Sequence, residues 1–296
     1  MSVGREEPGH GAPGGASPKP EPVAGTRRRW RAWTLVLVVL APLVLMMLVL
    51  DPIRQDPAYH LFADYRSYCG VPNFLNAVSN IPFLVVGAIG FAFCLRNPVP
   101  GALRSWQVFF LGVALVFLGS GYYHWAPDNR TLVWDRLPMT IAFMGMFAAL
   151  LAEHMGAWLE RVLLAPAVAV GIASVAWWAY SDDLRFYGWV QFAPLLAIPF
   201  ALAAYPAQYT HRRYLLYGLA CYLLAKIAEF YDPEIFTLTS RALSGHSLKH
   251  LLSALAGYYV FRMLQLRRAV DTPIPPSGQR QGAHGDRSEP RRSTSV

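Results

Sequence analysis

Long uncharged apolar runs are the feature of this sequence that most limits its possible folds. A helix that crosses a bilayer needs roughly 20 predominantly apolar residues, and several runs meet or approach that length. Only 15% of the residues are charged, against about 25% in soluble globular domains, and most charges lie outside the runs. Helices built from such runs would have no polar face for water. The sequence therefore predicts an all-α, polytopic membrane protein.

Eight segments of the chain are candidate membrane spans. They are 32–50, 73–95, 105–127, 137–152, 162–181, 186–210, 212–231 and 244–264. The last seven would form a seven-helix domain over 73–264. The first would be one extra transmembrane helix, joined to that domain by an outer segment, 51–72. Gly, Pro and polar residues are frequent at both ends of the chain, so 1–31 and 265–296 are predicted to be disordered cytoplasmic tails.

The first span has a rival interpretation, because four arginines precede it as in a signal peptide. Its apolar run is longer than the core of a usual signal peptide. No small-x-small cleavage site follows it before Asp51. A retained membrane anchor is therefore the favoured interpretation.

The positive charge of the chain fits a membrane topology better than a nucleic-acid partner. The net charge is +8. When the N-terminus is placed in the cytoplasm, the larger group of arginines also falls on the cytoplasmic side, as the positive-inside rule requires. That group comprises Arg27, Arg28, Arg29, Arg31, Arg96, Arg104, Arg161, Arg212, Arg213, Arg262, Arg267 and Arg268. Both termini are therefore predicted to be cytoplasmic, and no nucleic-acid partner is expected.

Polar residues inside the apolar spans gather at one predicted depth. Ser120 and His124 are four residues apart, which places them on one helix face. His246 and His250 have the same spacing at the start of the last span, and Asp135 lies near the start of the fourth. In the topology set by the arginines, all five lie toward the outer side. Because the histidines were not used to set that topology, their common depth indicates one site.

This group of side chains fits metal-assisted hydrolysis. Three neutral imidazoles suit Zn²⁺, and a catalytic zinc keeps three protein ligands and one water. Zinc lowers the pKa of such a water to roughly 7. Asp135 can accept its proton, and the Ser120 hydroxyl can stabilise an oxyanion. The competing interpretation is polar glue between helices, which explains one HxxxH pair better than three histidines at one depth.

Other ionisable residues lie in the last two spans. Lys226 and Glu229 are three residues apart, and either a proton relay or a lipid headgroup site is conceivable. An intrahelical ion pair is favoured, because intramembrane charges usually pair. Lys249 is expected to point away from the histidines and to pair with Glu229 or Asp232.

Three blocks of the sequence resemble the alkaline ceramidase family. They are NFLNAVSN (73–80), GSGYYHWAPDNRTLVWDRLPM (119–139) and GHSLKHLLSALAGYY (245–259). That family lies within a superfamily of seven-helix membrane hydrolases that includes adiponectin-type receptors. The resemblance implies a ceramidase-like seven-helix domain that hydrolyses the amide of ceramide, releasing a sphingoid base and a fatty acid.

The resemblance also implies roles for individual residues. By it, His124, His246 and His250 bind zinc, Asp135 acts on the zinc-bound water, and Ser120 assists the oxyanion. The match covers the complete set of expected metal ligands.

Two further parts of the resemblance concern the first core span and the loop before it. Asn76, Ser79 and Asn80 match a motif of the family's first helix, for which we expect a packing and supporting role. Animal members bind calcium through an acidic loop, but here that loop offers Asp64 and Asn73 and few other carboxylates, so calcium is not expected. The sequence is most similar to bacterial members.

The favoured function is a zinc-dependent membrane amidase that takes ceramide or a related N-acyl lipid sideways from the bilayer. We predict a multi-pass protein of a bacterial inner membrane with its active site near the outer face. The alternative is a receptor or regulatory protein on the same fold with structural zinc. A transporter is a third possibility, but the sequence has no internal pseudo-symmetry to indicate one.

Overall fold

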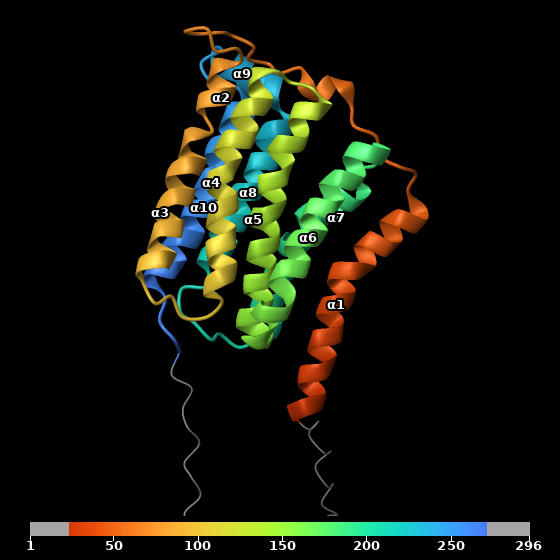
Figure 1. Cartoon of the computed structure of the whole chain (residues 1–296), viewed down its shortest axis with the longest axis vertical. Coiled ribbons are helices and arrows are strands. Elements are labelled where there is room, and N and C mark those ends of the chain that lie inside the picture. The colour runs from red at the N-terminus through yellow and green to blue at the C-terminus, as the bar shows by residue number, and fades with distance from the viewer. Residues whose placement is uncertain (1–23, 271–296) are drawn as a thin grey trace, which may run out of the picture.

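The computed structural model describes residues 24–270, and within that range the chain forms a bundle of long helices. The elements are α1 (Ala24–Val49), η1 (Pro57–His60), α2 (Phe74–Val78), α3 (Ile81–Arg96), α4 (Leu103–Trp125), α5 (Asn129–Met155), α6 (Trp158–Ser181), α7 (Arg185–Ala204), α8 (Tyr214–Phe230), α9 (Asp232–Leu238) and α10 (Gly245–Leu266). Figure 1 shows the long helices side by side, with α1 at one flank and the short helices α2 and α9 at one end. The all-α prediction is confirmed.

Within residues 24–270, six helices are long and apolar enough to cross a membrane, which confirms a polytopic membrane protein. They correspond to α1, the α2–α3 unit, α4, α5, α6 and α7. Helix α8 has 17 residues, somewhat fewer than the roughly 20 that a span needs. Helix α10 is long enough, but it carries Lys249, Arg262 and two histidines. That these two helices are the last two spans stays a prediction.

Several helix boundaries differ from those expected. Helix α1 begins at Ala24, so the residues just before 32 belong to the helix and not to a tail. The reason is local, because the arginines there are good helix formers and no proline interrupts them. Helix α5 extends beyond the apolar run 137–152 at both ends, where Arg136 donates to Gln55 and Glu153 accepts from Arg267 inside the bundle. The rest of the predicted tails, 1–23 and 271–296, lies outside the described residues.

The α1 helix packs on α7 through one face only. Leu35 and Val39 are buried against Ala193 and Ala197 of α7. The Trp189 indole also donates a hydrogen bond to the Val39 carbonyl at 2.6 Å. Most of the other large apolar side chains of α1, among them Trp33, Leu45 and Leu48, are exposed, as is typical of a helix whose other faces meet lipid.

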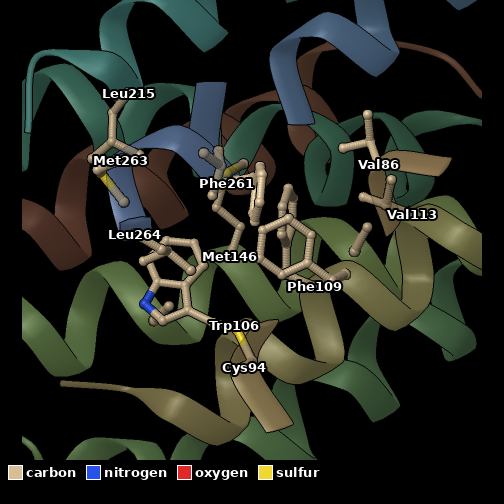
Figure 2. Close-up of a cluster of buried hydrophobic side chains, with 14 of the residues drawn as sticks. Val86, Cys94, Trp106, Phe109, Val113, Met146, Leu215, Phe261, Met263 and Leu264 are labelled. Atoms are coloured by element: carbon tan, nitrogen blue, oxygen red, sulfur yellow. The ribbon is translucent and has the colours of Figure 1, made fainter. Parts of the chain in front are cut away.

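An aromatic and aliphatic core joins α3, α4, α5 and α10. Trp106 and Phe110 are fully buried in it, and Phe110 contacts Phe261 edge to face. Figure 2 shows Trp106, Phe109, Met146 and Phe261 converging from three helices. This core fixes the helices whose opposite ends carry the polar residues.

The backbones of helices α4 and α5 approach each other closely at Gly119, where only a glycine fits. A Cβ added to Gly119 would lie 2.1 Å from the Trp134 carbonyl oxygen. Small residues allow such backbone approaches in membrane helices. Gly119 precedes Ser120 and Trp134 precedes Asp135, so this contact sets how near those two side chains lie.

Replacing Gly119 with alanine is expected to separate α4 from α5 and to lower both stability and activity. Overpacking of this kind costs about 1–3 kcal/mol. Gly121→Ala is the matched control, because nothing lies within 4 Å of its added Cβ and alanine favours helix over glycine. Thermal unfolding in detergent and product release would be measured for both. Equal behaviour of the two variants would contradict the proposed contact.

Candidate functional site

Three histidines from two distant segments meet inside the bundle. His124 is the penultimate residue of α4, and His246 and His250 lie in the first turns of α10. One ligand nitrogen from each lies within 4.8 Å of the others. All three are buried, His124 completely. The predicted convergence of these histidines is confirmed, and the group can hold a metal ion.

The start of α10 is held by two capping interactions. The Ser244 side chain accepts a hydrogen bond from the Ser247 backbone N–H at 3.1 Å. The Asp232 carboxylate accepts from the His246 N–H at 2.7 Å and from the Ala63 N–H at 2.9 Å. Asp232 therefore ties the histidine turn to the outer segment. From the sequence, Asp232 was expected only to pair with Lys249.

Close backbone contact also fixes the same turn. A Cβ on Gly245 would lie 2.1 Å from the Ala228 carbonyl oxygen. Glycine at this position lets α10 approach α8 and sets the depth of His246.

The hydrogen bonds of His250 orient its ring. The Ser79 hydroxyl donates to the Asn76 carbonyl at 3.0 Å and lies 2.8 Å from His250 Nδ1. Since a serine hydroxyl has one hydrogen, Ser79 accepts from the Nδ1–H of His250. This assignment leaves the lone pair of His250 on Nε2. A ligating histidine commonly has such a partner on its other nitrogen.

Asn76 connects the first core helix to α10 and to the outer segment. Its Oδ1 atom accepts hydrogen bonds from Ser247 at 2.8 Å and from Ser244 at 3.3 Å. Its Nδ2 group donates to the Asp64 carbonyl at 3.0 Å. Asn76 is fully buried, so these contacts agree with the supporting role predicted for this motif. Asn80, also fully buried, donates to the Asn76 carbonyl at 2.8 Å.

The outer segment covers the histidines. The Phe62 ring lies with its centroid 4.8 Å from that of His124 and 4.6 Å from that of His246. His60 of η1 lies 2.9 Å from the Tyr123 hydroxyl through Nδ1. η1 thus folds back onto the end of α4. No periodic pattern in the sequence indicated that the outer segment covers the histidines.

Ser120 and Asp135 lie on facing helices and line one cavity with His250. The Ser120 side chain interacts with the Asp135 carboxylate, and both residues are buried. The neighbouring Arg136 does not pair with Asp135. It donates to Gln55 at 2.6 Å and lies over the Trp178 ring at 3.9 Å. The structure thus brings all five predicted site residues to the same end of the bundle.

The cavity below the histidines is long and mostly apolar. Its volume is about 310 Å³. From His250 to Val260 it follows ten residues of α10, or about 15 Å of helix. Its apolar wall includes Phe83, Val113, Met146, Ile198, Leu219 and Val260, one from each of six helices. The charged side chains of its lining belong to the same end of the bundle as His250, and apolar side chains make up most of the rest.

The ionisable residues of α8 and α10 pair as predicted, with one exception. Glu229 pairs with Lys226 and with Lys249, the latter at 2.9 Å. Lys249 was expected to point away from the histidines, yet its Nζ atom lies 3.1 Å from His246 Nε2. The reason is that residues three apart on a helix are neighbours.

Asp64 is engaged by an arginine. Both of its carboxylate oxygens accept from the Arg66 guanidinium, each at 2.8 Å. Burial disfavours its ionised form, but the hydrogen bonds from Arg66 outweigh that effect and hold the pKa of Asp64 below its usual value. Asn73 instead donates to the His124 carbonyl at 2.9 Å. The two residues considered for calcium thus support the loop and the end of α4.

The donor set fits a bound metal ion. Both ring nitrogens of His124 are buried and have no hydrogen-bond partner in the part of the chain that the structure describes, and buried polar atoms are rarely left so. A metal ion between the three histidines would satisfy one of these nitrogens. The set of three imidazoles is the chemistry that zinc accepts.

Comparison with known proteins agrees with these observations. The family model described as Ceramidase matches residues 63–276, well over half of the chain. The match includes the three histidines, Ser120 and Asp135. No curated protein matches the sequence. The family match, the six apolar helices and the buried histidine group are mutually consistent, and the chain belongs to the ceramidase family.

Proposed function

We propose that this protein is a zinc-dependent membrane amidase that hydrolyses the amide bond of ceramide or a related N-acyl lipid. The observation that carries the proposal is the meeting of His124, His246 and His250 at the polar end of an apolar cavity inside the bundle. Family membership supports amide hydrolysis. The products would be a free fatty acid and an amine lipid.

The proposed chemistry divides among the residues at the polar end. A zinc ion held by the three histidines would act as a Lewis acid and promote ionisation of water. The Asp135 carboxylate would accept a proton from the attacking water and return it to the leaving nitrogen. The Ser120 hydroxyl would donate a hydrogen bond to the oxygen of the attacked carbonyl. Phe62 would limit access of bulk water from the outer segment.

The apolar part of the cavity would hold an acyl chain. The substrate would enter from the lipid, with its amide at the level of the histidines. We propose, as before, a bacterial inner membrane, cytoplasmic termini and a site near the outer face. The charge distribution of the loops supports that orientation.

Metal content and turnover of the purified protein test this function. About one zinc per chain is expected, with release of palmitate from C16 ceramide or N-palmitoylethanolamine. A chelator should abolish release, and added zinc should restore it. Zinc without turnover on any N-acyl lipid would favour the receptor alternative, in which the metal is structural. A protein without zinc would overturn the proposed site.

A further inference from the structure

The polar end of the cavity carries more positive than negative side chains. Arg136, Lys226 and Lys249 line it, against Asp135 and Glu229. Charged residues inside a membrane protein are costly and usually neutralise one another. A surplus cation inside an apolar bundle therefore needs a separate explanation.

Glu229 is shared between the two lysines. Its Oε1 atom accepts from Lys249 at 2.9 Å, and its Oε2 atom pairs with Lys226. Oε1 also accepts from the Tyr59 hydroxyl at 2.9 Å. One carboxylate compensates one ammonium group, so mutual pairing accounts for only part of this cluster.

Arg136 provides a second and independent observation. Its side chain is buried among the rings of Trp178, Tyr187 and Tyr59, at 3.9, 4.7 and 5.9 Å. Its Nη2 atom donates a hydrogen bond to Gln55, and its side chain also interacts with the Tyr187 hydroxyl. The Nη1 atom is buried and has no hydrogen-bond partner among residues 24–270, although a guanidinium has five donors and binds anions well.

These donors lie close to where a lipid amide would be cleaved. Lys249 lies 3.1 Å from His246 Nε2, and Arg136 follows Asp135 along α5. Both line the same cavity as His250 and Ser120. The apolar wall extends the other way, so the acyl chain and the cationic residues would occupy different parts of the cavity.

We propose that Arg136 and Lys226, with Lys249, form a site for an anionic group on the amine side of the substrate. The preferred substrate would then be an N-acyl lipid whose amine part carries a carboxylate or phosphate, rather than a neutral ceramide. The proposal rests on the proposed function for the identity of the lipid and adds the charge of its headgroup.

Two N-acyl lipids of nearly equal size test the effect of headgroup charge independently of headgroup shape. N-palmitoylglycine is anionic, and N-palmitoylglycinamide is its neutral counterpart. Wild type is expected to prefer the anionic lipid at least tenfold in kcat/KM, and at least tenfold in binding measured by thermal stabilisation in detergent. A tenfold ratio corresponds to about 1.4 kcal/mol.

Substitutions then test whether the cationic residues cause the preference for the anionic lipid. Lys226→Gln is expected to reduce the ratio to near one, whereas Lys226→Arg, which keeps the charge, should retain it. Arg262→Gln is the matched control, since Arg262 bonds Gln265 and does not line the cavity. Because the readout is a ratio between two lipids, a general loss of stability does not imitate the effect.

The possible outcomes distinguish this proposal from the amidase proposal. Equal binding and turnover of both lipids would overturn the anionic site while leaving the amidase intact. Preferential, Lys226-dependent binding without turnover would support the anionic site and count against the amidase. Palmitate is the third probe, because the fatty-acid product is also anionic. If palmitate alone depends on Lys226, the cluster receives the product and the substrate assignment is wrong.

Discussion

Replacing Asp135 with asparagine is expected to lower hydrolysis by about 10²–10⁴-fold, the usual contribution of a general base, while zinc content stays the same. Asparagine keeps the shape of the side chain but cannot accept a proton from water. Metal content should persist because the group that can hold a metal consists of three histidines and does not include Asp135. Fatty-acid release and zinc per chain would be measured on the same preparation.

Asp128→Asn is a suitable control for this variant. It makes the same chemical change at the N-cap of the same helix, where asparagine and aspartate cap comparably, and Asp128 is exposed. It should retain both zinc and activity. Loss of zinc together with activity in Asp135→Asn would instead identify Asp135 as a ligand, and unchanged activity would exclude it as the base.

The parts of the fold and site that could be predicted from sequence are those set by local periodicity. Uncharged runs identified the helices, because length and apolar composition are sufficient to indicate a span. The i,i+4 spacing placed His246 and His250 on one face, and the arginine bias placed His124 at the same end. Each inference needed only neighbours along one helix and the direction of that helix.

The features that could not be predicted depend on contacts between distant segments. Phe62 covers the histidines through a loop fold without periodicity. Helices α2 and α3 are separate because Ser79 and Asn80 form a turn between them, although the apolar run through 73–95 is continuous. The tether from Asp232 to His246 and Ala63 likewise joins three segments. Side chains such as these carry no signal until their partners are known.

Replacing His250 with alanine is expected to reduce zinc from about one per chain to near zero and to abolish hydrolysis. Only two histidines of the group would remain, fewer than the three ligands that a catalytic zinc keeps. Ser79→Ala should have a smaller effect, because it keeps the ligand but removes the partner of Nδ1. Loss of such a partner typically weakens metal affinity or activity by about 10–100-fold. Zinc content at defined free zinc would rank the variants.

His154→Ala controls for the loss of a part-buried imidazole elsewhere in the bundle. His154 lies near the end of α5, where its Nδ1 lies 2.8 Å from the Leu150 carbonyl oxygen, and it does not line the main cavity. It should leave zinc content unchanged. The expected order of zinc content is His250→Ala lowest, Ser79→Ala next, and His154→Ala equal to wild type. That order requires a metal held by the histidines, with the His250 ring oriented by Ser79 of the α2–α3 unit. Zinc retained in His250→Ala would mean that the metal binds elsewhere, and the shared depth of the three histidines would then reflect helix packing alone.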